Sequence, residues 1–151
     1  MIVYRLTQSR FKDDLSGEGA STYGGRWNSK GHRMLYCTEH VSLAVLEHVV
    51  NFNKSESAII PNFHLLEIKI PETKYLNLQL ADLKKDWLAD IHYTRFIGDE
   101  FLKAKSSLMM KVPSAVVPEE HNFIINPYHK DFQKIETIHA KIYKLDGRLT
   151  V

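Results

Sequence analysis

The chain has 151 residues, of which 44% are hydrophobic and 25% are charged, and its 20 basic and 18 acidic side chains leave a net charge of +2. This composition excludes an intrinsically disordered chain, because apolar residues are too frequent and the net charge is too small. It also argues against a nucleic-acid binder that works through bulk charge, since such domains usually carry a basic stripe.

The location of the protein is indicated by what the sequence lacks. Its one cysteine, Cys37, cannot form an intramolecular disulfide, and the first residues have neither the basic region nor the apolar core of a signal peptide. No apolar run approaches the ~18 residues of a membrane-spanning helix. No linker or repeat divides the chain. We therefore expect one soluble, cytoplasmic domain over residues 1–151.

In chain order, the first part of the sequence predicts a strand, a long loop, a second strand and a helix, at Met1–Leu6, 7–33, Met34–Thr38 and Val41–Phe52. The loop holds five of the seven glycines, and a long loop in a compact domain is usually functional. The helix is apolar around most of its circumference, so we expect it to be buried on nearly all sides. Thr38 or Ser42 is expected to cap it.

The rest of the chain predicts more strands than helices. Alternation predicts strands at Asn62–Ile70 and Leu76–Leu80, and helices are expected at Asp82–Asp90 and at Thr94–Lys105, with Thr94 as a cap. Further β-like runs follow at Leu108–Val112, Ala115–Val117, Phe123–Ile125 and 135–145. The fold class that we expect is α+β, a single compact mixed-sheet domain with six or seven strands and three helices.

Metal and nucleophile chemistry find little support in the sequence. Among the eight histidines there is no HExxH motif and no helical pair at four-residue spacing, and CxxC is absent, so we expect no metal site. Cys37 lies in an apolar predicted strand, where a thiol is usually an inert small hydrophobe. No GxSxG motif marks a nucleophilic serine.

Glu47 is the most unusual single residue, because it is a carboxylate inside an apolar helix. Burying an unpaired charge costs several kcal/mol, so such a group must be paired, protonated or placed at the wall of a binding site. Buried acids are often functional. The ordinary explanation is an ion pair with a strand arginine such as Arg5, and both explanations stay open.

Two other clusters could bind a ligand. Arg26 follows two glycines in the long loop, and arginine is the preferred residue for bidentate phosphate binding, although a surface arginine explains it equally well. Ser114, Asn122 and Asn126 interrupt short β runs, where hydroxyls and amides suit the recognition of polar ligand groups. Ordinary turn chemistry also accounts for these three residues.

Taken together, these clusters resemble the RES domain family, which is named for its Arg, Glu and Ser. The matching pieces are GGRWNSKG, LYCTEHVSLAVLEHV and VPSAVVPEEHNFIINPYH, and the ending LDGRL is similar to the terminal strand of the family except at Gly147. The resemblance spans almost the whole chain. It implies an ADP-ribosyltransferase-like core and a toxin of a bacterial toxin–antitoxin pair that acts on NAD.

The resemblance also implies roles for individual residues. Its signature residues are Arg26, Glu47 and Ser114. The resemblance also implies that Tyr36 and Ser42, and more loosely Arg5, bind NAD. We add the hypothesis that Asn122 does so too. The partner that it implies is a helix-turn-helix antitoxin of the Xre type that covers the active site, and a homo-oligomer within that complex stays open. It implies no metal, no direct nucleic-acid binding and no membrane association.

The reaction that follows is cleavage of the nicotinamide–ribose bond of NAD through an oxocarbenium-like transition state, with phosphate or water as acceptor. Glu47 would stabilise the growing positive charge, Arg26 would bind the diphosphate, and the glycine-rich loop would close over the dinucleotide. Transfer of ADP-ribose to a protein is the alternative, although Val45 stands where many arginine-directed transferases carry a second acid. A non-catalytic nucleotide-binding or interaction module and an RNA-binding toxin are the rivals of another class.

Overall fold

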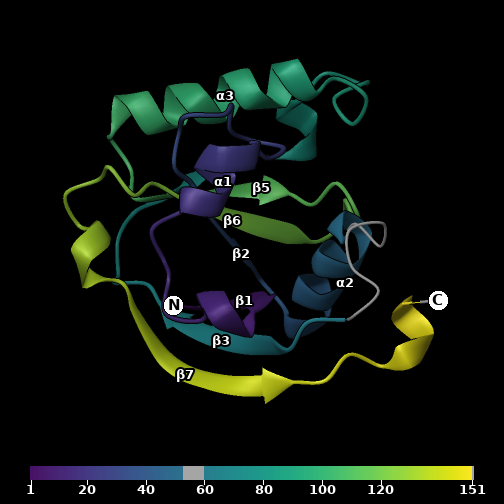
Figure 1. Ribbon diagram of the computed structural model, residues 1–151. Coiled ribbons are helices and arrows are strands. Elements are labelled where there is room, and N and C mark those ends of the chain that lie inside the picture. Colours follow the sequence, from purple (N-terminus) through teal and green to yellow (C-terminus); the bar gives the residue numbers. More distant parts are fainter. Residues whose placement is uncertain (53–59, 151) are drawn as a thin grey trace.

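The computed structural model describes residues 1–52 and 60–150 (Figure 1). Within this part of the chain lie three α-helices, at Glu18–Tyr23 (α1), Val41–Asn51 (α2) and Ile91–Ala104 (α3). The strands are β1 (Ile2–Gln8), β2 (Leu35–Thr38), β3 (Phe63–Lys69), β4 (Leu76–Asn77), β5 (Met109–Pro113), β6 (His121–Ile125) and β7 (Glu136–Tyr143). They form one mixed sheet of seven strands, so the expected α+β class is confirmed.

The sheet has the strand order β4-β5-β6-β2-β1-β3-β7, and only the β4–β5 pair is parallel. Its two halves are joined weakly, because β1 and β2 pair only at Tyr4 and Thr38. Two side chains reinforce this junction. The Thr38 hydroxyl donates to the Tyr4 carbonyl at 3.4 Å, and Nη1 of Arg5 donates to the Tyr36 carbonyl at 3.1 Å. The Arg5 guanidinium therefore bridges the gap where the two strands diverge.

Each face of the sheet is packed against other parts of the chain. One face carries a core built from β1, β2, β3, β5 and β6. On the other face α3 and the segment around Trp27 cover β5 and β6, and α2 covers β1 and β3. Figure 1 shows α3 and α1 stacked above β5 and β6. Because paired residues share a face, Tyr4, Thr38 and Asn122 form a row across three strands between these two covered regions.

The long predicted loop at 7–33 is only partly a loop, which corrects the sequence-based expectation. It contains the short helix α1, which starts after Gly17. Gly17 has a φ of +77°, a conformation that favours glycine. A Cβ there would lie 2.7 Å from the backbone nitrogen of Met34, so glycine also lets this segment pass close to the start of β2. No aliphatic periodicity marks a helix this short, which is why the pattern missed it.

Three other expectations in the second half are wrong. Residues 115–117 form a bend and not a strand. The segment 82–90 is a series of turns after a 3₁₀ turn at Leu80–Asp82. Helix α3 begins at Ile91, with the Asp90 side chain accepting from the Tyr93 amide as the cap, so Thr94 is not a cap.

Helix α2 is close to its predicted bounds, but two of its expected properties are wrong. His40 is its N-cap residue and makes no side-chain capping bond, so neither Thr38 nor Ser42 caps it. It is also not buried on all sides. Leu46 and Val50 are 37% and 63% exposed, because the helix lies against the sheet on one side only. No helix in residues 1–52 or 60–150 has the length and apolar character needed to cross a membrane.

Replacement of Gly98 tests the contact between α3 and the Trp27 segment. A Cβ at Gly98 would overlap the Trp27 carbonyl oxygen, only 1.6 Å away, although alanine is the better helix former. We expect Gly98→Ala to lower the free energy of unfolding by roughly 1–3 kcal/mol, measured by urea denaturation. Gly19→Ala in α1 is the matched control, since nothing lies within 4 Å of a Cβ there. Equal stability of the two variants would contradict the packing described.

Cys37 lies in the core with 1% of its surface exposed, and burial raises the pKa of its thiol to about 12 from an ordinary 9.0. The unfolded chain therefore loses this proton at lower pH than the folded chain does. Its contribution to stability is complete below pH 9 and is lost progressively towards pH 12, by up to about 1.4 kcal/mol per pH unit. We expect the stability difference between the native chain and Cys37→Ala to shrink between pH 8 and pH 10.5 in urea unfolding. A pH-independent difference, or rapid native reaction of the thiol with an alkylating reagent, would contradict this burial.

Candidate active site

The carboxylate of Glu47 is held by two side chains from distant parts of the sequence. The Ser114 hydroxyl donates to Oε1 at 2.8 Å, and the Asn122 amide nitrogen Nδ2 donates to the same oxygen at 2.5 Å. These partners lie 67 and 75 residues away along the chain. Three elements meet here, namely α2, the end of β5 and β6. We call Glu47, Ser114 and Asn122 the carboxylate cluster.

Ser114 is fully buried, and its hydroxyl is oriented by the turn that follows it. Its Oγ accepts hydrogen bonds from the backbone N–H groups of Val116 and Val117, at 3.0 and 3.1 Å. With both amides donating to this oxygen, its own proton is directed at Glu47. This arrangement also explains why residues 115–117 are not a strand, since the N–H groups of Val116 and Val117 bond back to the serine.

Asn122 lies within β6, opposite Thr38 on one side and Val112 on the other. Its Nδ2 is committed to Glu47, and its Oδ1 is buried without a hydrogen-bond partner among the described residues. A buried acceptor without a partner costs about 1–3 kcal/mol, so Asn122 is a costly residue to keep for structure alone. Its amide orients the carboxylate.

The ion pair considered for Glu47 does not form. No salt bridge in residues 1–52 and 60–150 involves Glu47, and Nη1 of Arg5 bonds to the Tyr36 carbonyl instead. Both side-chain hydrogen bonds to Glu47 reach Oε1, and Oε2 accepts none within the same residues. The carboxylate is therefore fixed in orientation through Oε1, and no hydrogen bond within the described ranges uses its second oxygen.

Arg26 does not join the carboxylate cluster. Its Nη1 donates to the Leu88 carbonyl at 3.2 Å, and its guanidinium lies over the Trp87 ring at 5.9 Å from the centroid. The backbone around it is held by α3. The Thr94 hydroxyl donates to the Arg26 carbonyl at 2.6 Å, and Nε of Arg95 donates to the Gly25 carbonyl at 2.8 Å. The Arg26 loop is therefore attached to α3, and its closure over a dinucleotide stays a prediction.

Tyr36 holds this loop from the side of the sheet. Its hydroxyl accepts from the Trp27 amide at 3.0 Å and donates to Oδ1 of Asn28 at 2.7 Å. Burial of the hydroxyl raises the pKa of Tyr36 well above its ordinary value. A Cβ at Gly25 would lie 2.5 Å from the hydroxyl oxygen, so this close approach needs a glycine. The hydroxyl is thus occupied with the Arg26 loop.

Several residues that hold the Arg26 loop were not found from the sequence. The Asp99 carboxylate accepts from both the amide and the hydroxyl of Ser29, at 3.0 and 2.6 Å. Asn28 is fully buried, and its Nδ2 donates to three backbone carbonyls. The spacing of Arg95 and Asp99 on one face of α3 is a usable signal, but only the tertiary contact shows what that face meets.

The two remaining predicted residues lie apart from the cluster. Ser42 is exposed on the first turn of α2, and none of the hydrogen bonds to the Glu47 carboxylate in the described residues comes from it. The register of β1 with β3 pairs Arg5 with Leu66, on the face opposite Asn122. Nε of Arg5 is buried without a hydrogen-bond partner in the described part of the chain.

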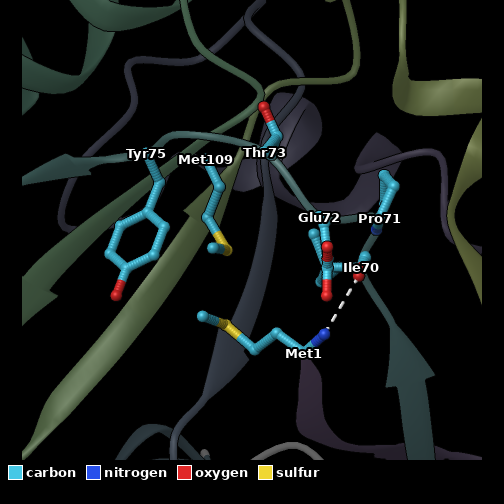
Figure 2. Close-up of a pocket in the computed structure, with 7 residues that line it drawn as sticks. All are labelled: Met1, Ile70, Pro71, Glu72, Thr73, Tyr75 and Met109. Atoms are coloured by element: carbon cyan, nitrogen blue, oxygen red, sulfur yellow. Dashed lines mark hydrogen bonds between the residues drawn. The ribbon is translucent and has the colours of Figure 1, made fainter.

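A metal site and a second pocket are the two other kinds of site to consider in the described residues. No group of three or more His, Cys, Asp and Glu side chains lies close enough to hold a metal ion there. A pocket lined by Met1, Tyr75, Met109 and their neighbours lies at the start of β5 (Figure 2). Ser114 follows the other end of that strand, so this pocket is separate from the carboxylate cluster.

Comparison with known proteins agrees with the resemblance noted in the sequence. A family model described as the RES domain matches residues 2–146. A protein of Photorhabdus laumondii named "Toxin Res" is 42% identical over 99% of this chain and 97% of its own length. A protein of a Sphingobium species named "Prs ADP-ribosylating toxin" is 33% identical over 91% of this chain and 87% of its own.

A solved structure shares the fold. It is the M. tuberculosis MbcT–MbcA toxin–antitoxin complex, matched with a TM-score of 0.78 over 95% of this chain and 84% of the matched chain. At 19% identity, this likeness concerns the fold alone.

Proposed function

This chain belongs to the RES domain family of toxins, and we propose that it is an enzyme that consumes NAD by cleaving the bond between nicotinamide and ribose. The observation that carries the proposal is the Glu47 carboxylate, held on one oxygen by Ser114 and Asn122. A charged group fixed in this way needs no reorganisation when positive charge develops beside it.

Cleavage of this bond needs a negative charge beside the ribose and does not need a strong acid to protonate the leaving group. When the bond between the ribose C1′ and the nicotinamide nitrogen breaks, its electron pair stays on the nitrogen and nicotinamide leaves as a neutral molecule. The ribose becomes oxocarbenium-like, and Oε2 of Glu47 is the group that faces this charge in our proposal. An oxygen of water or inorganic phosphate then bonds to C1′, and the attacking water gives up a proton to solvent.

Each remaining residue is given a role that its contacts support. We assign Arg26 to the diphosphate of NAD, because its guanidinium keeps N–H donors beyond the one bonded to Leu88. Ser114 and Asn122 act as positioning residues for Glu47, and Tyr36 as a positioning residue for the Arg26 loop. The NAD-binding roles expected for Arg5, Tyr36, Ser42 and Asn122 stay predictions.

Transfer of ADP-ribose to a protein is the second candidate, favoured by the relative named as an ADP-ribosylating toxin. Against it stands Val45, two residues before Glu47, which is 7% exposed in the core under α2. An acidic side chain at this buried position would be costly, so the second acid of many arginine-directed transferases has no place here. We therefore favour degradation of NAD, in the bacterial cytoplasm and by one domain.

The proposal is tested by mixing the purified chain with NAD, with and without inorganic phosphate, and measuring nicotinamide and the mass of the ADP-ribose product. We expect nicotinamide release that falls at least about 100-fold in Glu47→Gln, the scale of loss when one stabilising group is removed. Ser114→Ala is expected to lower turnover less, since Asn122 still holds the carboxylate. A product one phosphate heavier than ADP-ribose would identify a phosphorylase.

Glu100→Gln on the exposed side of α3 is the matched control, because it removes a carboxylate outside the cluster and should leave turnover unchanged. Nicotinamide release that is the same in Glu47→Gln and the native chain would contradict the proposal and favour a non-catalytic module. Release that occurs only with a protein acceptor, and labels it with ADP-ribose, would favour the transferase.

We further propose that a helix-turn-helix antitoxin of the Xre type binds this chain over the carboxylate cluster. The support is the shared fold with a toxin from a toxin–antitoxin complex. Co-expression with a helix-turn-helix protein encoded by an adjacent reading frame should restore growth of the host, and the two proteins should co-purify. Glu47→Gln should co-purify equally well. Co-expression that leaves toxicity unchanged would contradict the partnership.

A further inference from the structure

Strand β7 forms an edge of the sheet that is exposed along almost its whole length. It comes last in the strand order and pairs only with β3 among the described residues. Every residue of β7 is exposed except Tyr143, which is half-buried. Figure 1 shows the strand as the outermost layer, on the side of the molecule away from α3. Its outward N–H and C=O groups therefore have no partner from another strand in the described chain.

One face of β7 is mostly apolar, with Thr137 as its polar residue. Ala140 and Ile142 are paired with Leu66 and His64 of β3, so they share a face, and Ile138 is the extra residue of a bulge beside them. Ile142 is 77% exposed and Ile138 is 47% exposed. Edge strands in soluble proteins are usually short or protected by charge, and an apolar edge is a site for pairing with another strand.

The sequence of β7 is complementary to itself in an antiparallel arrangement. Paired residues must share a face, so a two-fold axis has to place one residue opposite its own copy. With Ala140 on the axis, Ile138 of each copy lies opposite Ile142 of the other, and the apolar faces meet. Centred on Lys141, the same strand would instead oppose two lysines.

The charges of the other face agree with the axis at Ala140. Because the bulge lets Thr137 and Ile138 together oppose Ile142, Glu136 comes opposite Tyr143 of the other copy. Glu136 is then diagonal to Lys141 of that copy, a spacing that long side chains can bridge. Each dimer would gain two such ion pairs of opposite charge.

We propose that β7 pairs with β7 of a second copy of this chain, antiparallel and with the two-fold axis at Ala140, so that the two sheets become continuous. One strand pair is a small interface beside the about 1,200–2,000 Å² of stable complexes, so the dimer is weak and depends on concentration. The two partners of Glu47 lie just after β5 and on β6, and β2, β1 and β3 separate these strands from β7. The inference stands independently of the proposed enzyme activity.

The register is tested by disulfide cross-linking, because Cys37 is buried and an added cysteine is the accessible one. Ala140→Cys should form a cross-linked dimer, since the two copies meet on the axis. Ile142→Cys is the matched control. In this register the two added cysteines are displaced from each other by four residues along the strands, or roughly 13 Å, which is beyond disulfide reach. Ile138→Cys combined with Ile142→Cys should cross-link again. Equal cross-linking of both single variants would overturn the register.

Sedimentation equilibrium of the native chain and of charge variants tests the dimer itself. Lys141→Glu should weaken association by about three- to tenfold, because it repels Glu136 of the other copy. Adding Glu136→Lys to it should restore association. A native chain that stays monomeric at every concentration, with no cross-linking of Ala140→Cys, would overturn the proposal and leave this edge for a strand of another protein.

Discussion

One oxygen atom, Oε1 of Glu47, joins the elements from which the site is built. It accepts from Ser114 at the end of β5 and from Asn122 within β6, while its own backbone belongs to α2. A carboxylate in a partly buried position is tolerated only when such donors satisfy it. The turn after Ser114 and the register of β6 are therefore both constrained by one side chain on a different element.

The second constraint is the attachment of the Arg26 loop. Tyr36 holds it from the sheet, and Thr94, Arg95 and Asp99 hold it from α3. These bonds place Arg26 on the same side of the sheet as Glu47, while its guanidinium points to Trp87 and Leu88. A ligand that contacts both residues has to reach from α2 to this loop, which is what the proposed binding of NAD requires.

The regular parts of the fold could be predicted because they follow period and burial. The alternation of β3 and the apolar stretch of α2 are patterns of residues that are neighbours in the sequence. The predicted bounds of both elements are therefore close to the observed ones. The strand predicted at 115–117 does not form, because the amides of Val116 and Val117 turn back to bond Ser114. Helix α1 was not predicted, because it is short and its position depends on tertiary contacts such as the close approach of Gly17 to Met34.

For the site, the local sequence is enough to show that Glu47 is anomalous, because a carboxylate within an apolar helix carries a desolvation cost. It also marked Arg26 and Ser114 through the family resemblance. The three-dimensional fold is needed to find which groups satisfy Glu47, since Ser114 and Asn122 reach it across 67 and 75 residues and hydrogen bonding depends on distance in space. The fold is likewise needed to show that Tyr36 holds the Arg26 loop, because no local pattern indicates that its hydroxyl bonds to Trp27 and Asn28.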